Sequence, residues 1–513
     1  MTKHVAIAGA GIAGLGAALA LARSGVRVTL LERDATPLPA SPVEAFESWP
    51  RRGAPQVKHS HAFLARLRNL LRDRAPDVLA ALLAAGAEEL PLANLLRPGI
   101  DDASPKPGDE DLTLLACRRI TFEWVLHRLV EREANVRFRD GCEVRGLIVD
   151  GELAGRPRVV GVRLRSPGRA ERGASREARG FSREAHGIGR EEEELRADLV
   201  VDASGRRSPL PSWLAAAGLP ALDEASEPCG VYYCSRFYRL LAGVTSPERE
   251  TTIGADLGYL KYAIFHGDGR IFSITFAAAP EDKPIRALLR EAPFDAAARQ
   301  FPVIARWIDP AVSEPITTVY GMDNLHNARR SLAQQGEPRV AGLVLLGDAA
   351  IHTNPLYGRG CTFALLHAFL LADALAAHPH DVLAAARALE AATEREIVPW
   401  YRAALAQDRD AAAWAAQLRG EAQPGASGAG GAVDARAYFR DLMRRGLVPA
   451  LRLDATVLRA FSRGFNLLDP PGDLMRRPEL LQRVLKIYQG REQRVEPDLG
   501  PGRDALIRVL EAA

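Results

Sequence analysis

Three glycines with the spacing Gly9-x-Gly11-x-x-Gly14 stand between a short apolar run, His4–Ala8, and a longer one from about Ile12 to Ser24. The first run is expected to form a strand and the second a helix. In this context Gly9 permits a tight turn, Gly11 lets the backbone approach a pyrophosphate, and Gly14 lets helix and strand pack closely. The helix N-terminus adds free N–H groups and a positive dipole end. The pattern indicates a dinucleotide site.

Glu32 provides the carboxylate that a dinucleotide site of this kind needs after its second strand. Gly25 ends the expected helix, and a second strand, Arg27–Glu32, places Glu32 18 residues after Gly14. A carboxylate at this strand end can accept hydrogen bonds from both ribose hydroxyls and would repel a 2′-phosphate. The unit by itself does not distinguish FAD from NAD.

A second segment of the same kind lies more than 300 residues further on. The apolar run from Leu343 ends in Gly347-Asp348, and Pro355, Gly358 and Gly360 follow before another long apolar run. A single NAD does not need two helix starts, whereas a cofactor with a pyrophosphate and a second polar ring does. Asp348 is placed to bond a ribityl hydroxyl, and the backbone between the glycines can lie against an isoalloxazine edge. An ordinary strand–loop–helix of an α/β sheet is the alternative.

Composition limits the class of protein. The chain has 513 residues, of which 47% are apolar and 26% charged, so it can bury a large core in two to four structural units. Its net charge of +3 gives no reason to expect a nucleic-acid partner. Its five cysteines lack C-x-x-C spacing, which argues against a disulfide scaffold or zinc site and suits a reducing, cytoplasmic compartment.

Two apolar runs are long enough to suggest membrane helices. Val5–Ala22 is uncharged over 18 residues, but its glycines favour the strand–turn–helix described above. Cys361–Ala377 contains His367 and Asp373 and is expected to be a buried helix. We therefore expect no integral membrane segment.

Taken together, four motifs resemble the FAD-dependent monooxygenases of the para-hydroxybenzoate hydroxylase fold, over roughly residues 1–375. The motifs are Gly9–Gly14 with Glu32, Cys117-Arg118-Arg119, Val201-Asp202-Ala-Ser-Gly205-Arg206, and Gly347-Asp348…Pro355…Gly358-x-Gly360. Three further segments resemble the polyether-type FAD epoxidases within that superfamily. They are Gly53-Ala-Pro55-Gln56-Val-Lys58-His59-Ser-His61, Asp202-Ala-Ser-Gly-Arg-Arg-Ser-Pro with the Trp213 segment, and Asn354-Pro-Leu-Tyr-Gly-Arg-Gly.

The resemblance implies an FAD site in which the flavin, and not a protein side chain, carries out the reaction. The implied FAD-binding residues are Gly9, Gly11, Gly14, Glu32, Arg119, Asp202, Gly205, Asp348, Pro355, Gly358 and Gly360. Glu32 would bind ribose, Arg119 the phosphate region and Asp348 the ribityl or ribose side. No catalytic side chain is implied, because the flavin carries the chemistry through a C4a-(hydro)peroxide. O2 is the implied co-substrate, and the reductant is NAD(P)H or a partner flavin reductase.

Some histidines depart from the family pattern. The superfamily often has His three residues after the Gly-Asp aspartate, where this chain has Ile351, so the neighbouring His352 is interpreted as a polar loop residue. His59 and His61 alternate on a short segment and either shape a loop or contact the flavin. No further ligands lie nearby in sequence, so we expect no metal site.

The expected fold class is α/β: a discontinuous Rossmann-like FAD-binding domain, a mixed or antiparallel-sheet substrate domain and a helical C-terminal region. The expected limits are 1–228 (with a mobile insertion at 165–196), 229–340, 341–378, and 379–513 with a linker at 420–431. A hairpin is expected around Gly267-Asp268-Gly269. Five aromatic residues of the substrate domain are candidates for a substrate pocket, although core packing is favoured for each. They are Tyr232, Tyr259, Phe265, Phe272 and Phe276.

The favoured function is oxygen insertion into a small apolar natural-product intermediate, with alkene epoxidation first and aromatic hydroxylation or Baeyer–Villiger oxidation open. A flavin reductase of the geranylgeranyl-reductase type is the second class. A halogenase is disfavoured because the six Trp include no Trp-x-Trp pair. A non-catalytic flavin-binding protein is the remaining alternative. The C-terminal helices are expected to cap the pocket or mediate a dimer, so the protein is expected to be a monomer or homodimer.

Overall fold

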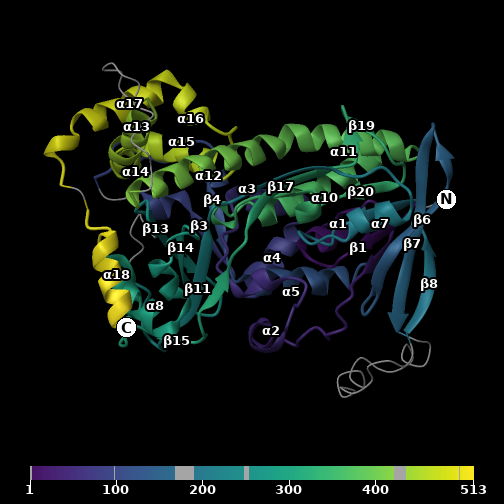
Figure 1. Ribbon diagram of the computed structural model, residues 1–513, viewed down its shortest axis with the longest axis horizontal. Helices are drawn as coiled ribbons and strands as arrows, with labels where there is room; N and C mark the ends of the chain where they lie inside the picture. Colours follow the sequence, from purple (N-terminus) through teal and green to yellow (C-terminus); the bar gives the residue numbers. More distant parts are fainter. Residues whose placement is uncertain (1–2, 97–98, 168–189, 248–253, 421–434, 496) are drawn as a thin grey trace.

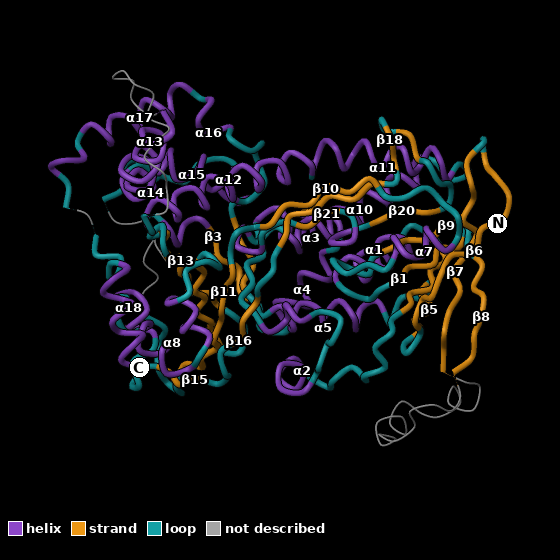
Figure 2. The backbone as a smooth tube through the Cα atoms, in the orientation of Figure 1, coloured by secondary structure: helices purple, strands orange, loops and turns teal. Residues whose placement is uncertain are grey.

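The structure is a computed structural model that describes residues 3–96, 99–167, 190–247, 254–420, 435–495 and 497–513. It is elongated and belongs to the expected α/β class (Figure 1). A parallel sheet with its helices occupies the centre and right of the view. An antiparallel sheet lies at the lower left with the last helix beside it, and the helices of residues 435–489 lie at the upper left. Figure 2 shows how strands and helices alternate along the parallel unit.

The parallel sheet has the strand order β20-β9-β1-β2-β5. Its strands are β1 (His4–Ala8), β2 (Arg27–Leu31), β5 (Val136–Arg139), β9 (Leu199–Asp202) and β20 (Leu343–Leu345). All four neighbouring pairs are parallel. The three central strands are almost entirely buried, as expected for strands that helices cover on both faces.

Helices α1 (Ile12–Arg23), α5 (Arg119–Val130) and α10 (Gly360–Ala377) pack around this sheet. By length and apolarity α10 is able to cross a membrane, but 72% of it is buried inside the structure, as expected for a core helix. Four shorter helices and a pair of strands surround these elements. They are α2 (Pro42–Ser48), α3 (Ala65–Arg74), α4 (Pro76–Ala84), α7 (Leu210–Ala216) and the antiparallel pair β3 (Glu88–Pro91) and β4 (Thr113–Ala116).

A second, antiparallel sheet has the order β12-β13-β14-β11-β15, with β16 also paired to β11. Its strands are β11 (Tyr232–Leu240), β12 (Gly254–Asp256), β13 (Leu260–His266), β14 (Ile271–Ala278), β15 (Ser313–Pro315) and β16 (Tyr320–Met322). The hairpin predicted around Gly267–Gly269 joins β13 and β14. Helices α8 (Glu291–Ala298), α9 (Pro302–Trp307) and α18 (Arg503–Ala512) contribute to the core under this sheet.

A third sheet, β10-β17-β21, is antiparallel. It consists of β10 (Asp223–Pro228), β17 (His326–Ser331) and β21 (Ile351–His352), with the small pair β18 (Ala333–Gln334) and β19 (Glu337–Pro338) beside it in sequence. The interpretation of His352 as a loop residue is wrong, because this residue is 6% exposed and pairs with Ala328 in the sheet. The domain limits at 228 and 340 stay a prediction.

The expected insertion at 165–196 is partly wrong. Its two ends belong to β7 (Arg156–Pro167) and β8 (Arg190–Arg196), which form a sheet with β6 (Glu143–Leu153). The Arg/Glu-rich composition that indicated mobility supplies cross-strand pairs of opposite charge, since the register puts Arg163 opposite Glu194 and Arg165 opposite Glu192. Residues 168–189 lie outside the described residues.

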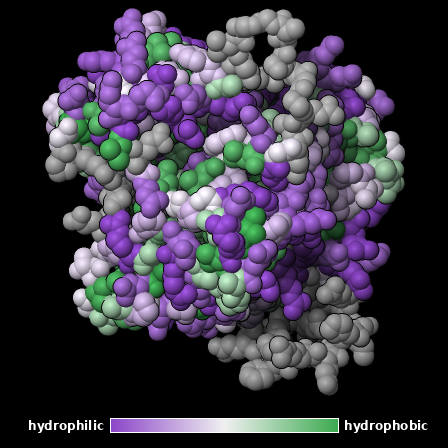
Figure 3. Space-filling model, turned by 60° about the vertical axis from the view of Figure 1, so that its left-hand side comes forward, coloured by the Kyte–Doolittle hydropathy of each residue, from purple (hydrophilic) through white to green (hydrophobic). Residues whose placement is uncertain are grey.

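The C-terminal region is helical, as predicted. It contains α11 (Val382–Glu396), α12 (Val398–Leu418), α13 (Ala435–Leu442), α14 (Val448–Leu453), α15 (Ala455–Phe465), α16 (Asp473–Arg476) and α17 (Pro478–Gln489). Most of the expected linker at 420–431 lies outside the described residues. Figure 3 views this end of the molecule and shows its apolar residues in separate patches among polar ones.

Gly14 provides a test of the packing between β1 and α1. A Cβ atom at Gly14 would lie 1.8 Å from the carbonyl oxygen of Gly9, and backbone atoms cannot move aside. We expect Gly14→Ala to lower the free energy of unfolding in urea by about 1–3 kcal/mol, the usual range for overpacking. The control is Gly464→Ala in α15, where a Cβ meets no atom within 4 Å. An unchanged urea midpoint for Gly14→Ala would contradict the packing described.

Candidate functional site

Three turns meet at the carboxyl edge of the parallel sheet. The register places Ala8 beside Asp202 and Asp202 beside Leu345, so β1, β9 and β20 end at the same level. A Cβ at Gly9 would lie 2.7 Å from the Ala203 carbonyl oxygen, so the first two turns touch. The connections from β1 and β9 diverge here, and open α/β sheets bind ligands at such a switch point.

The turn after β1 matches the roles predicted for its glycines. Gly9 has a φ of +101°, which favours glycine. Gly11 is the N-cap of α1, no side chain caps this helix, and a Cβ at Gly11 meets no atom within 4 Å. The backbone is therefore open toward the space in front of the helix N-terminus. This open cradle fits a phosphate group.

Glu32 stands directly beside that turn. One carboxylate oxygen accepts the Ala10 N–H at 3.2 Å, and the other accepts the Asp34 N–H at 2.9 Å. The side chain is 13% exposed, so its remaining acceptor capacity faces a partly open space. This geometry is compatible with the predicted contact to a ribose.

A buried chain of charges continues from Glu32. Arg51 lies 3.6 Å from Glu32, donates to the Ala10 carbonyl oxygen and forms an ion pair with Glu123. Arg119 donates to Glu123 at 3.0 Å and to the Cys361 sulfur at 3.2 Å. Burial alone would raise the pKa of Glu123, but the two arginines hold it below its ordinary value. The two arginines and the two glutamates, Glu32 and Glu123, therefore compensate one another in charge beside the phosphate cradle.

Arg51 and Glu123 were not among the predicted site residues. Glu123 stands four residues after Arg119 in α5, a spacing that favours an ion pair. Arg51 has no comparable local signal, because its partners come from three separate parts of the chain. The buried Nε of Arg119 has no hydrogen-bond partner among the described residues, which is consistent with the predicted contact to a ligand acceptor.

Asp348 belongs to the turn after β20. It accepts a hydrogen bond from Arg206 Nε at 3.0 Å, so this contact ties the turn after β9 to the turn after β20. Burial opposes its ionisation, yet Arg206 and then His352 hold the pKa of Asp348 below its ordinary value. A Cβ at Gly360 would lie 3.8 Å from the Asp348 carboxylate, which places Asp348 at the uncapped start of α10.

Asp202 does not present its carboxylate to the site. It is fully buried and accepts hydrogen bonds from the Ser204 N–H and hydroxyl and from the Ser208 hydroxyl. Burial raises its pKa. Asp202 therefore shapes the turn, in which Gly205 has a φ of +88°, while Arg206 is the residue that reaches Asp348.

The loop Asn354–Gly358 precedes α10, and hydrogen bonds to a residue of the C-terminal region hold it in place. Asp408 of α12 accepts hydrogen bonds from Asn354 Nδ2 at 2.7 Å and from the Tyr357 hydroxyl at 2.6 Å. Pro355 lies inside this loop, and Gly358 ends it with a φ of +66°. Asp408 could not be found from sequence, because an aspartate in an amphipathic helix normally faces solvent.

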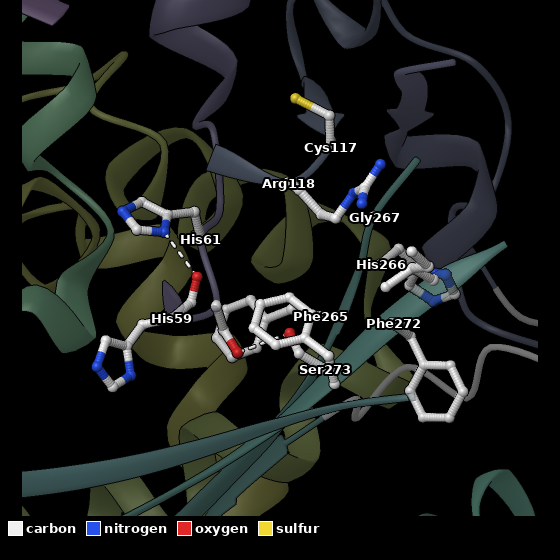
Figure 4. A pocket seen from close by; sticks show the side chains of 12 residues that line it. His59, His61, Cys117, Arg118, Phe265, His266, Gly267, Phe272 and Ser273 are labelled. Carbon is white, nitrogen blue, oxygen red and sulfur yellow. Dashed lines mark hydrogen bonds between the residues drawn. The ribbon is translucent and has the colours of Figure 1, made fainter. Parts of the chain in front are cut away.

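A small pocket lies between the His59–His61 segment and the antiparallel sheet (Figure 4). The hydroxyl of Ser60 is 2.7 Å from those of both Ser273 and Thr275. Burial lowers the pKa of His59 to about 4, and burial followed by Arg119 lowers that of His61 to about 3, so both rings are neutral near pH 7. The described residues contain no cluster of three metal-ligating side chains.

The predicted pocket aromatics separate into two groups. Phe265 and Phe272 line this pocket. Tyr232 and Phe276 are buried in the core beneath the sheet, and Tyr259 packs there with its hydroxyl donating to the Pro501 carbonyl oxygen at 2.6 Å. The structure therefore shows core packing, the alternative favoured for each of the five, for these three residues. The Phe272 ring belongs to the same core, because it lies on the same face of β14 as Phe276 and stacks on Tyr238.

Two sequence comparisons bear on this chain. Residues 7–48 match the family model described as an NAD(P)-binding Rossmann-like domain. Protein Rv3254 of Mycobacterium tuberculosis is 31% identical over 398 residues, which cover 73% of each chain. The segment that matches the family model contains the turn after β1, the whole of α1 and Glu32.

Solved structures share the fold at low identity. The myxobacterial chondrochloren halogenase CndH, a variant FAD-dependent halogenase, aligns with a TM-score of 0.56 at 18% identity, covering 98% of this chain and 99% of its own. OxyS anhydrotetracycline hydroxylase from Streptomyces rimosus has a TM-score of 0.52 at 16% identity and coverages of 91% and 76%. PqsL, a probable FAD-dependent monooxygenase from Pseudomonas aeruginosa, aligns with a TM-score of 0.51 at 16% identity, covering 82% of this chain and 98% of its own. These likenesses show the fold.

His367 supports the turn that carries Asp348 and predicts a pH dependence. Its Nδ1 accepts the Gly347 N–H at 3.1 Å, and burial lowers its pKa from 6.5 to about 4. Between those values the unfolded chain binds a proton that the folded chain does not, so stability falls as the pH is lowered. We expect His367→Gln to reduce the slope of unfolding free energy against pH by about 1.4 kcal/mol per pH unit.

The measurement is urea unfolding between pH 4 and pH 7, with His380→Gln, which removes an exposed histidine, as the control. If His367→Gln and the parent showed the same slope, His367 would not be a buried neutral group.

Proposed function

The chain belongs to the family of Protein Rv3254, and from the site described above we propose that it is an FAD-dependent monooxygenase acting on a small apolar organic substrate. The supporting observation is the convergence of two helix N-termini without side-chain caps, those of α1 and α10, at one edge of the parallel sheet. Each has a carboxylate beside it, Glu32 for the first and Asp348 for the second.

The residues present fit FAD. Gly11 leaves open the approach to the α1 N-terminus, and the Arg119 guanidinium, whose Nε has no partner among the described residues, can donate to a pyrophosphate. Asp348 stands where a ribityl chain would pass from one helix start to the other. Gly358 and Gly360 provide backbone without side chains near the start of α10, where the ring system of FAD would lie. Bound FAD would supply the redox chemistry, namely activation of O2 and transfer of one oxygen atom.

The protein's own contribution is to position the substrate and exclude water. The antiparallel sheet and the His59–His61 segment enclose the pocket, and Phe265 forms an apolar wall. Burial makes His59 and His61 weak bases that are neutral near pH 7. A neutral, apolar substrate suits these surroundings.

Within this class we propose alkene epoxidation, which needs no protein base when the oxidant is electrophilic. Support comes from the resemblance of the His59–His61 and Asn354–Gly360 segments to FAD epoxidases. Aromatic hydroxylation is the second candidate, favoured by the fold shared with OxyS. We further propose that NAD(P)H or a partner flavin reductase reduces the cofactor, and that the protein acts in the cytoplasm as a monomer or homodimer.

FAD binding is testable at Gly11. The N-cap has a φ of −80° and a ψ of −174°, which any residue adopts, and a Cβ there meets no protein atom. We expect the Gly11→Val variant to fold like the parent but to bind FAD at least about tenfold more weakly. The valine side chain would occupy the space through which the phosphates approach the backbone. Fluorescence titration of FAD, with circular dichroism for folding, measures both; parental affinity would show that this turn is not the cofactor site.

The reaction class is testable with labelled oxygen. Reduced FAD, a panel of polyenes and aromatic compounds, and 18O2 should yield a product that carries one 18O atom, with or without chloride. The same mixture under argon should yield no product. Product formed without O2 would contradict the monooxygenase and favour a flavin reductase, and a chlorinated product would favour a halogenase.

A further inference from the structure

Arg118 and Asp268 form a buried ion pair that joins the start of α5 to the β13–β14 turn. Asp268 accepts the Arg118 backbone N–H at 2.8 Å, the side-chain Nε at 3.1 Å and Nη2 at 2.5 Å, and the Thr121 hydroxyl at 2.8 Å. Both charged side chains are 2% exposed. Nε and Nη2 of the guanidinium are therefore used by one carboxylate.

The third nitrogen, Arg118 Nη1, is buried and has no hydrogen-bond partner among the described residues. A buried donor left unpaired is costly, and native structures usually supply it with water or a ligand. The guanidinium also lies over the Phe46 ring at 4.6 Å, so its position is fixed on two sides. Nη1 is thus a preorganised donor.

Arg118 lines the small pocket described above, together with Ser60, Phe265 and Phe272 (Figure 4). The cavity itself measures about 10 Å³, enough for one water-sized group, which suits a single carbonyl oxygen at the end of a substrate and not a whole substrate. A Cβ at Gly358 would lie 3.6 Å from Ala62, so the chain segment that lines the pocket continues directly to the loop proposed to frame the flavin. The pocket therefore adjoins the proposed reaction site.

The charges around the pocket favour a neutral ligand. Arg118 and Asp268 compensate each other, and His59 and His61 are uncharged near pH 7 because burial lowers their pKa. Burial raises the pKa of the Cys117 thiol, which is therefore also uncharged. A carboxylate in this pocket would be a buried charge without a counter-ion, which is costly, whereas a carbonyl oxygen needs one donor.

We propose that this pocket binds the carbonyl oxygen of a neutral, otherwise apolar substrate through Arg118 Nη1. This inference rests on the proposed function, since it takes the pocket as one end of the substrate site. Arg118 is then the residue that determines specificity for a carbonyl-bearing substrate, and Phe265 contacts the apolar part next to the carbonyl.

The test compares three probes of the same size and shape on the FAD-loaded protein: 2-acetylnaphthalene, 2-naphthoate and 2-ethylnaphthalene. Binding is followed by the change in flavin absorbance and tryptophan fluorescence. We expect the ketone to bind at least about tenfold more tightly than the hydrocarbon or the carboxylate, as for one hydrogen bond to a charged donor. Equal affinities, a preference for the carboxylate, or no ketone binding would overturn the proposal.

Arg118→Lys is the matching variant, because it keeps the positive charge opposite Asp268 but loses the forked guanidinium. It should bind all three probes with affinities within about threefold of one another. Arg128→Lys, later in α5, is the control and should retain the preference for the ketone. If Arg118→Lys retained that preference with an unchanged melting temperature, Arg118 would not be the donor. FAD content, measured separately, reports on the proposed function, so the two failures are distinguishable.

Discussion

The close packing of α1 against α10 and the turn after β20 is the constraint on which the site depends. A Cβ at Gly16 would lie 2.7 Å from Leu365, and one at Gly347 would lie 2.6 Å from Ala13. Gly347, with a φ of +58°, requires glycine at this contact, whereas a side chain at Gly16 would force Leu365 to move. The close packing brings together two helix N-termini that are more than 300 residues apart in sequence, so that one elongated ligand can reach both. The surrounding charges, Arg51 with Glu123 and Arg206 with Asp348, link the same turns.

Features that depend on local sequence were predicted well. The strand β1 has the predicted limits, and α1 ends at Arg23, one residue before the prediction. The start of α10 differs by one residue, and the β13–β14 hairpin turns at Gly267–Gly269 as expected. Glycine spacing, alternation of apolar residues and a change from strand to helix periodicity are short-range signals, so they can be read without knowing the tertiary structure.

Features that depend on distant partners were not predictable in this way. The carboxylate of Asp202 turns inward because Ser204 and Ser208 surround it, and His352 is buried because β17 pairs with its strand. Asp408 holds a loop that lies 51 to 54 residues earlier in the chain. Asp268 occupies a typical turn position, yet its role follows from Arg118, 150 residues away. In each case the physical reason is a tertiary contact that leaves no periodic pattern in the sequence.

The central claim is that one FAD molecule spans the two helix N-termini. The most direct measurement is a crystal structure of the protein with bound FAD. The account predicts the pyrophosphate at Gly11 and the start of α1, the adenosine ribose at Glu32, and the ring system beside Gly358 and Gly360. Density for the dinucleotide at any other place, or for a ligand that contacts α1 but not α10, would contradict it.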